Sequence, residues 1–545
     1  MSGLRARWLG RMPYQEAWDL QRAFHEGRAS GRAADDYLLL LEHPHTYTVG
    51  RSGGESNLLV SPEELGRLGI ELHHVDRGGD ITYHGPGQLV GYPIMHLGES
   101  PDPVAYVRSL ERALVLALAD LDIEAWAEAG YTGVWTAAGK VAAIGVRSAR
   151  RVTMHGFALN VSADLGFFRH IVPCGIAGRP VASVSDLARR RVSIEEMVER
   201  VVPRFAEVFG YSSVETQLGA FTRGSGRAPG SFEVDRLVAA GALSPRASTG
   251  APPTVEGRLL DEPERPDWMR VRANLGAGYR GLRNLVDGLG LHTVCQEAGC
   301  PNIYECWAAG TATFLLLGGT CTRACSFCDV ATGRPGPVDP GEPARVAEAV
   351  ARLGLSHAVL TSVDRDDLPD GGAGVFAEAV RRIRDWVPSC AVEVLIPDFK
   401  GDPAALATVM AERPEVLNHN TETVLRLQRE VRTAAGYGRS LALLARAKWM
   451  NPPGMVKSGL IVGMGETREE VLGALADLRA VGVDVVTIGQ YLRPTARHRA
   501  IHRYVAPAEF TEYTARGEAL GLRRVEAGPL VRSSYRAGLA REAAG

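Results

Sequence analysis

The stretch CTRACSFC, residues 321–328, decides how the second half of this 545-residue chain folds and works. Its cysteines follow C-x3-C-x2-C spacing, directly after an apolar run that begins at Thr313. Three thiolates on one short loop can hold three irons of a four-iron cluster and leave the fourth iron without a protein ligand. An open coordination position lets a metal centre activate a substrate, whereas a structural zinc site needs four ligands. The loop therefore predicts a catalytic iron–sulfur centre.

A second cysteine triplet lies just upstream of the first. Cys295, Cys300 and Cys306 follow C-x4-C-x5-C spacing, and this triplet too is one ligand short of closing a cluster. The other two cysteines, Cys174 and Cys390, stand alone in the sequence. Dense cysteines in a large chain without an export signal are more often metal ligands than a disulfide framework. We interpret Cys390 as a buried small residue.

Both halves of the chain show the patterns of α/β domains. In the first half, residues 37–41 form an apolar run typical of a buried strand, and residues 104–121 have apolar positions at helical spacing. From about Arg258 onward, helical patterns alternate with short apolar strands, and such repeated units favour a parallel barrel or open sheet. The sequence predicts these strands at residues 357–361, 391–395, 459–462 and 484–488. In the first half it also predicts a strand at residues 140–146 and a helix after Ser193.

Three glycine-containing segments of the first half carry residues suited to chemistry. They are RGGDITYHGPGQ at 77–88, GKVAAIG at 139–145, and MHGFALN followed by PCGI within 154–176. Glycines let a backbone approach a ligand closely. A cysteine becomes a nucleophile when a nearby cation stabilises its thiolate, and Lys140 is a candidate for that role beside Cys174. Taken alone, Cys174 is more readily interpreted as a structural residue.

Composition excludes some classes of protein and indicates the domain organisation. With 45% hydrophobic residues and a net charge of -2, the chain reads as a cytoplasmic globular protein with no nucleic-acid partner. No apolar run reaches the roughly 18 residues of a membrane span, so we expect no membrane association. Residues 220–257 are rich in Gly, Ser and Pro and predict a flexible linker between domains at 1–219 and 258–545.

The two triplets, together with further segments of the second half, resemble lipoyl synthase. These segments are SVDRDDLPDGGA, EVLIPDF, NHNTETV, GLIVGMGET and VRSSYRAG. The resemblance implies a radical S-adenosylmethionine (SAM) partial (β/α) barrel with two [4Fe–4S] clusters. It assigns Cys321, Cys325 and Cys328 to the cluster that binds SAM. It assigns Cys295, Cys300, Cys306 and Ser533 to an auxiliary cluster that is consumed as the sulfur donor, with Ser534 as the less favoured alternative to Ser533. Glu393, Ser362 and Asn418, at or near strand ends, are candidates to contact SAM.

The segments of the first half resemble octanoyl-acyl-carrier-protein:protein octanoyltransferase, across nearly all of residues 5–215. This implies a mixed sheet with helices like that of biotin and lipoate ligases, and a catalytic pair of Cys174 and Lys140. Among the histidines, His84 is the strongest candidate, followed by His43 and His155, while His45 is expected at the surface. The acyl and acceptor pocket is expected to be lined by Arg77, Gly78, Gly79, Asp80, Ile81, Thr82, Tyr83, His84, Ala143, Ile144, Gly145, Gly156, Phe157 and Ala158.

The product of the first activity is the substrate of the second, so the two resemblances support each other. Together they imply a bifunctional enzyme of lipoate biosynthesis. The first half would transfer octanoyl from acyl carrier protein to a lysine of a lipoyl domain. The second would insert sulfur at carbons 6 and 8 of that chain by radical chemistry. A linker of about 35 residues spans roughly 30–35 Å and would raise the effective concentration of the intermediate near the second site.

The implied partners are octanoyl-acyl carrier protein, the lipoyl domains of 2-oxoacid dehydrogenase complexes and the glycine cleavage H protein. An electron donor such as ferredoxin or flavodoxin and an iron–sulfur carrier are also implied. Three alternatives stay open: an ATP-using lipoate ligase in the first half, a biotin-synthase-like enzyme in the second, and a cluster-carrying scaffold that does not cleave SAM. The pair of Cys174 and Lys140, the absence of a Walker-type phosphate loop and the second triplet disfavour them.

Overall fold

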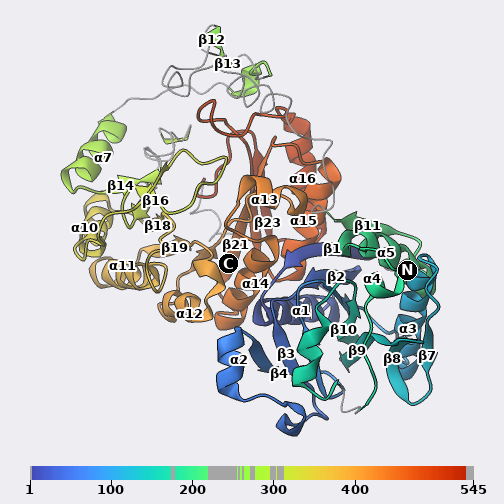
Figure 1. Cartoon of the computed structure of the whole chain (residues 1–545). Coiled ribbons are helices and arrows are strands. Elements are labelled where there is room, and N and C mark those ends of the chain that lie inside the picture. Colours follow the sequence, from blue (N-terminus) through green and yellow to red (C-terminus); the bar gives the residue numbers. More distant parts are fainter. Residues whose placement is uncertain are drawn as a thin grey trace, which may run out of the picture.

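The computed structural model describes residues 3–173, 178–218, 254–255, 258–259, 263–269, 277–294, 302–303 and 312–535. These residues form two α/β parts, one built from the first 218 residues and one from the second half of the chain (Figure 1). Among the described helices, none is long and apolar enough to cross a lipid bilayer.

The first part is built on an eight-stranded mixed sheet with the order β11-β1-β2-β6-β10-β9-β8-β7. Strand β1 pairs in parallel with β2 and β11, and the other neighbours are antiparallel. A three-stranded sheet, β4-β3-β5, stands beside it. The strands are β1 (Leu4–Arg11), β2 (Asp36–Glu42), β3 (Thr46–Val49), β4 (Glu71–His74), β5 (Ile81–His84), β6 (Gln88–Ile94), β7 (Trp126–Glu128), β8 (Tyr131–Thr136), β9 (Gly139–Ala149), β10 (Val152–Asn160) and β11 (Val214–Gln217).

Helices cover both faces of this sheet and give it two apolar layers. Helices α3 and α5 pack on one face, and α1 packs on the other against β6 and β10. The Ser193 hydroxyl caps α5 by accepting a hydrogen bond from the Glu196 amide at 3.2 Å, as its sequence indicated. The helices are α1 (Tyr14–Ala29), α2 (Pro62–Leu68), α3 (Pro103–Ala119), α4 (Val184–Leu187) and α5 (Ile194–Phe209).

The second part is an open barrel of eight strands that follow one another in chain order, β14-β15-β18-β19-β20-β21-β22-β23. All neighbours are parallel except β14 and β15. The strands are β14 (His292–Thr293), β15 (Ala312–Leu316), β18 (His357–Ser362), β19 (Ala391–Leu395), β20 (Val416–Asn418), β21 (Met455–Val462), β22 (Val485–Gln490) and β23 (Arg524–Gly528). Two short pairs, β12 (Thr254–Val255) with β13 (Arg258–Leu259) and β16 (Thr320–Cys321) with β17 (Ala331–Thr332), stand apart.

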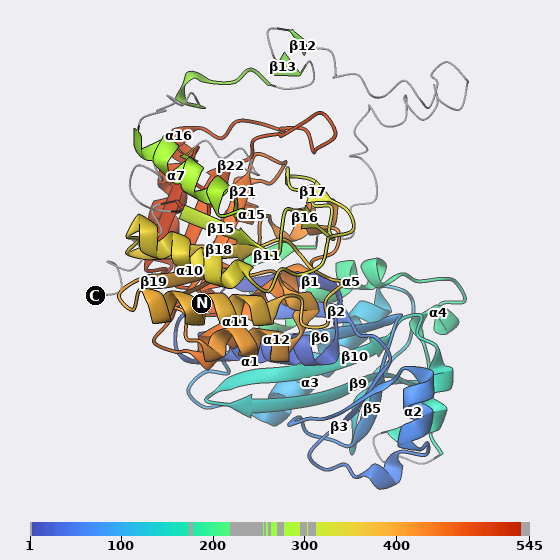
Figure 2. The ribbon, with the colours of Figure 1, turned by 90° about the vertical axis from the view of Figure 1, so that its left-hand side faces the viewer.

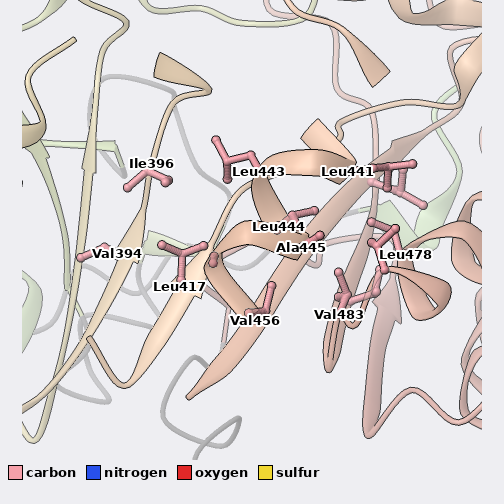
Figure 3. Close-up of a cluster of buried hydrophobic side chains, with 14 of the residues drawn as sticks. Val394, Ile396, Leu417, Leu441, Leu443, Leu444, Ala445, Val456, Leu478 and Val483 are labelled. Atoms are coloured by element: carbon pink, nitrogen blue, oxygen red, sulfur yellow. The ribbon is translucent and has the colours of Figure 1, made fainter. Parts of the chain in front are cut away.

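Helices wrap the outside of this open barrel and fill its apolar layer. Leu444 of α14 lies near Val456 of β21, and Leu478 of α15 lies near Leu441 and Val483 in the same apolar layer (Figure 3). Such α-after-β connections place each helix on the outer face of the parallel strands. The helices are α7 (Ala277–Gly288), α10 (Glu342–Leu353), α11 (Ala373–Trp386), α12 (Pro403–Ala411), α13 (Gln428–Val431), α14 (Tyr437–Met450), α15 (Arg468–Ala480) and α16 (Pro507–Ala519).

The fold class predicted from the sequence is confirmed: a mixed sheet with helices is followed by a partial (β/α) barrel. The predicted strands at 37–41, 140–146, 357–361 and 391–395 all lie within observed strands. The connecting residues 219–253 lie outside the described ranges, so the predicted linker and the domain limits stay predictions.

Candidate active sites

The three cysteines of the 321–328 loop line one cavity of about 360 Å³ at the carboxyl ends of the barrel strands. Thr361 and Ser362 at the end of β18, and Gly489 and Gln490 at the end of β22, line the same cavity. Carboxyl ends of parallel strands meet at one edge, which is where such barrels place their reactive groups. The geometry therefore presents three thiols to a single cavity.

These thiols suit a four-iron cluster better than a single ion. Within the described ranges, no three His, Cys, Asp or Glu side chains converge on one metal ion. Cubane ligands need not converge, because each thiolate binds a different iron. Burial raises the pKa of the thiols, to about 12 for Cys325 and about 11 for Cys328, so cluster binding must displace their protons. The donor set fits a four-iron cluster, which Cys321, Cys325 and Cys328 would hold and in which one iron would have no protein ligand.

Arg323, inside the cysteine loop, fixes the loop to the barrel. Its guanidinium donates to both carboxylate oxygens of Asp366 at 2.8 Å and to Asp398 at 2.7 Å, and it lies 3.3 Å from Asp364. Asp398 in turn lies 3.5 Å from Arg439, which pairs with Glu16 of the first part at 3.2 Å. Charge-assisted contacts of this kind are short and directional. They hold the loop in one position relative to the strands.

Ser533 and Ser534 both line the cavity that holds the cysteine loop. The other three residues of the predicted auxiliary site, Cys295, Cys300 and Cys306, lie outside the described residues. Their described neighbours nevertheless reach the same region. Val294 lines the cavity, and the Asn302 amide donates to the carbonyl of Leu530, close in sequence to Ser533.

The three candidates for SAM contact divide between the cavity and the barrel interior. Ser362 lines the cavity, and its buried hydroxyl has no hydrogen-bond partner among the described residues. Glu393 and Asn418 are fully buried and are absent from the cavity lining: Asn418 donates to Glu393 at 2.9 Å, and Lys457 donates to the same carboxylate oxygen at 2.9 Å. The structure thus brings Glu393 and Asn418 together inside the barrel, with Ser362 at the cavity.

The sequence reasoning missed Asn420 and Glu422, which line the cavity directly after β20. Glu422 adopts a φ of 64°, a conformation that is uncommon for non-glycine residues. The Asn420 side-chain amide donates to Glu422 at 3.0 Å. The side-chain oxygen of Asn420 is buried and has no hydrogen-bond partner among the described residues. Asn420 and Glu422 alternate with other residues in the segment NHNTETV, directly after a strand. This pattern could have identified them, because polar residues at the ends of barrel strands line the active site in such folds.

The buried pair of Glu393 and Lys457 gives a stability prediction. Burial by itself raises the pKa of Glu393, but Lys457 and His357 outweigh it and lower the pKa to about 2. The Lys457→Met variant leaves this carboxylate buried without its cation, so we expect a loss of about 3–5 kcal/mol at pH 7. The measurement is urea unfolding of the full chain followed by circular dichroism.

The same pair makes the free energy of unfolding depend on pH. Because the folded pKa is depressed below about 4.3, the unfolded value, the stabilisation is present above that pH and is lost as pH falls toward 2. The difference between wild type and Lys457→Met should therefore shrink over this interval. The double variant Glu393→Gln/Lys457→Met is the control and should recover most of the loss. A Lys457→Met variant as stable as wild type at pH 7 would contradict the assignment.

In the first part, the three predicted glycine-containing segments meet at one place. On β9 and β10, Gly145 pairs with Gly156 and Ala143 with Ala158 in antiparallel register. The loop before β5 joins them, because the Gly78 amide donates to the Val146 carbonyl at 3.0 Å. The predicted pocket residues 77–84, 143–145 and 156–158 therefore lie side by side, although they come from distant parts of the sequence.

The histidines of this region are held by internal partners. His84 is buried, with its ring nitrogens 2.9 Å from Gln88 and 3.3 Å from Thr48, and burial lowers its pKa well below the usual value. His43 is buried and hydrogen-bonds Tyr92 at 2.7 Å, and burial lowers its pKa to about 4. Both rings are therefore neutral at pH 7 and shape the pocket without carrying charge.

The other two histidines differ in their surroundings. His155 is buried on β10, with its Nε2 2.7 Å from Asp76. His45 is half-buried and not a free surface residue: its ring stacks on Phe167 with centroids 4.2 Å apart, and its Nδ1 lies 2.8 Å from the Tyr83 hydroxyl. Its ring is therefore only partly exposed, because Tyr83 of β5 and Phe167 of the 3-10 helix at Leu165–His170 lie against it.

Lys140 is buried on β9, and its ammonium lies 5.4 Å from the centre of the Trp135 ring. Cys174 itself lies outside the described residues, with 175–177. The chain on either side of it is anchored to the pocket. The Val172 amide donates to Asn57 at 2.8 Å, and the Lys140 amide donates to the Pro180 carbonyl at 3.0 Å. These hydrogen bonds place Val172 beside Asn57 and Pro180 beside the strand that carries Lys140.

Comparisons with known proteins divide the chain at the same point. Residues 13–206 match the lipoyl protein ligase A/B catalytic domain, and residues 315–488 match the radical SAM superfamily. The lipoyl synthase of Rubrobacter xylanophilus is 56% identical over 273 residues, which are 50% of this chain and 85% of the relative. That of Chloroflexus aurantiacus is 55% identical over 280 residues, 51% of this chain and 92% of the relative.

Among solved structures, the chain is similar to a putative lipoate protein ligase from T. acidophilum with bound lipoic acid. The two chains are 19% identical, with a TM-score of 0.34, and the match covers 40% of this chain and 90% of that chain.

A three-cysteine loop at the carboxyl edge of a parallel barrel, with a matching family model, defines the second half as a radical SAM enzyme with a [4Fe–4S] cluster. The first half is an acyltransferase domain of the lipoyl protein ligase A/B type. The chain belongs to the lipoyl synthase family. It is an enzyme of lipoate biosynthesis that joins a catalytic domain of the lipoyl protein ligase A/B type to a lipoyl synthase domain in one chain.

Proposed function

We propose that the chain builds the lipoyl group on lipoyl domains in two steps. The first half transfers an octanoyl group from acyl carrier protein to the acceptor lysine, and the second half replaces two C–H hydrogens of that chain by sulfur. The observation that carries the second step is the shared cavity of the cysteine loop and Ser533. It supports a site where SAM, the octanoyl chain and a sulfur source meet.

Some residues of the radical site hold the cluster, and others contact SAM. Cys321, Cys325 and Cys328 hold the cluster, and Arg323 fixes their loop. When bound, the clusters supply the electron that cleaves SAM to a 5′-deoxyadenosyl radical and the sulfur that enters the product. Ser362 and Asn420 present buried polar atoms at the cavity, and we assign them to contacts with SAM.

The second cluster is held by Cys295, Cys300, Cys306 and Ser533. Support comes from Val294, which lines the same cavity as Ser533, and from the Asn302–Leu530 hydrogen bond. A serine oxygen is a harder ligand than a thiolate and binds iron less firmly in such a cluster. This makes the auxiliary site the labile one, as a consumed sulfur source requires.

Ser533 and Ser534 both line the cavity, so a pair of variants distinguishes them. In Ser533→Ala we expect sulfur insertion to fall to background, because the auxiliary cluster loses a ligand, while reductive SAM cleavage persists. Ser534→Ala should retain insertion within about threefold of wild type, a change below 1 kcal/mol. Iron content, 5′-deoxyadenosine and thiolated product are measured together. Loss of insertion only in Ser534→Ala would move the ligand to that residue.

In the first half, Cys174 is the nucleophile and Lys140 is its proton partner. The thiolate attacks the thioester carbonyl of the acyl carrier, the C–S bond to the carrier breaks, and the carrier thiol leaves with the proton. The acceptor lysine then attacks the acyl-enzyme as a neutral amine, and its proton passes through Lys140 back to the cysteine sulfur. Burial of Lys140 beside small residues of β9 supports this role.

An ATP-dependent ligase is the second candidate, because the matching family model covers lipoyl protein ligases as well. Incubation with a lipoyl domain and either octanoyl-acyl carrier protein or free octanoate with ATP separates the two activities. We expect acylation only from the carrier protein. Acylation that requires ATP and free acid would support the ligase.

The partners follow from these reactions. The acceptors are lipoyl domains, and we assign those of 2-oxoacid dehydrogenase complexes and the glycine cleavage H protein. Ferredoxin or flavodoxin supplies electrons, and an iron–sulfur carrier rebuilds the auxiliary cluster. Reduced thiols are required at both sites, which favours the cytoplasm as the compartment.

A further inference from the structure

Helix α1 of the first domain lies between the two catalytic domains (Figure 2). One side of α1 packs on the transferase sheet, where the Gln21 side chain accepts a hydrogen bond from the His155 amide at 2.8 Å. The other side packs on α14 and α15 of the barrel. Buried apolar residues of both domains, including Leu20 and Leu441, belong to one continuous cluster. A single apolar core therefore spans the junction between the domains.

Charged groups at this junction pair across it with little exposure to water. Arg7 of β1 makes two hydrogen bonds to Asp477 of α15, at 2.7 and 3.0 Å, and the two side chains are 1% and 0% exposed. On α1, Asp19 accepts a hydrogen bond from Arg446 of α14 at 2.8 Å. Paired charges of this kind fix the register of an interface, since any other orientation leaves them unpaired.

The two domains approach each other closely at two glycines of the junction, Gly27 and Gly473. A Cβ atom on Gly27 of α1 would lie 2.3 Å from the Ala480 carbonyl oxygen of α15. A Cβ atom on Gly473 of α15 would lie 2.2 Å from the side-chain amide nitrogen of Gln217 on β11. Surfaces that meet at this distance are packed as tightly as a protein interior.

We propose that the face formed by α1, β1 and β11 and the face formed by α14 and α15 make a permanent interface. Each face is the docking surface for the other domain, and the interface, rather than the connecting segment, sets the orientation of the two active sites. This replaces the tether expected from the sequence. The lipoyl domain, and not the enzyme, then moves between two fixed sites.

The interface also reaches the radical site. Glu16 on α1 pairs with Arg439, which lies 3.5 Å from Asp398, and Asp398 accepts from Arg323 of the cysteine loop. A chain of charged contacts thus connects the first domain to the loop that holds the cluster.

The test cuts the connection and asks whether the domains stay together. A specific protease site is inserted within residues 225–245 of the full chain, and the purified holoenzyme is cleaved. At about 1 µM we expect both fragments to elute from a sizing column together, at the position of the uncut chain, because the buried interface suffices for binding. Elution of the cut wild-type chain as two separate domains would overturn the proposal.

Two glycine variants locate the contact. Gly27→Leu places a side chain against Ala480, because the three atoms nearest to the added Cβ all belong to the backbone of that residue. The fragments of the cut variant should therefore separate. Gly66→Leu on α2 is the matched control: no atom lies within 4 Å of its added Cβ, and the cut chain should stay together. Co-elution of the cut Gly27→Leu chain would place the attachment elsewhere and overturn the assigned interface.

A variant in the second domain tests the interface without changing the first domain, so misfolding of the first domain cannot explain its result. Asp477→Arg places a second cation against Arg7 and should likewise separate the cut fragments. Octanoyl transfer by each uncut variant reports that the first domain is folded.

Discussion

Replacing Cys321 by alanine abolishes SAM cleavage and sulfur insertion while octanoyl transfer continues at the wild-type rate. Cys321 lines the radical-site cavity together with Cys325 and Cys328, and a cluster held by two thiolates is not retained. The transferase pocket is built from strands of the other domain, so it keeps its geometry. Anaerobic assays of 5′-deoxyadenosine and of the octanoylated lipoyl domain measure the two activities in one sample.

Cys390→Ala is the control for this variant. Cys390 is also a buried thiol of the barrel, 3% exposed, but it precedes β19 and is absent from the cavity lining. It should keep SAM cleavage within about threefold of wild type. Full SAM cleavage by Cys321→Ala would show that the cluster has other ligands, and the assignment of the loop would fail.

Replacing Cys174 by alanine has the opposite effect on the two activities. Octanoyl transfer from the carrier protein should fall by at least about 10³-fold, because no acyl-enzyme can form. Sulfur insertion into a lipoyl domain that already carries octanoate should be unchanged, since it occurs in the other domain. Lys140→Met should lower transfer as well, with a shift in its pH profile that a purely structural residue would not cause.

Trapping of the acyl-enzyme provides the second readout. Wild type incubated with octanoyl-acyl carrier protein alone should gain one octanoyl group, and the mass should map to the peptide that contains Cys174. The Cys174→Ala chain should gain none, and the Cys390→Ala chain should acylate like wild type. An octanoyl group on another residue would show that Cys174 is not the nucleophile.

Local patterns predicted the elements and much of the sites. The apolar run at residues 391–395 coincides with β19, and the spacing from Cys321 to Cys328 predicted thiols that do share one cavity. The three glycine-containing segments of the first half do meet. These predictions succeeded because the pattern of a strand and the spacing of ligands each involve only a few neighbouring residues.

The sequence could not reveal contacts that depend on distant partners. Glu393 is polar and lies on a strand, as expected for a ligand contact, but the structure pairs it inside the barrel with Lys457, 64 residues away. The contact between Arg7 and Asp477 joins residues 470 positions apart. Gly27 reads as an ordinary helical glycine until Ala480 is placed beside it. No local periodicity encodes such pairs, because tertiary packing alone creates them.

The most direct test of two successive reactions in one chain is a single anaerobic incubation. The reconstituted enzyme receives octanoyl-acyl carrier protein, a lipoyl domain, SAM and a reductant, and mass spectrometry follows the lipoyl domain. The account predicts an octanoyl adduct that converts to the two-sulfur product, with one 5′-deoxyadenosine formed for each C–H bond broken. An octanoyl adduct that never gains sulfur, while SAM is cleaved, would contradict it.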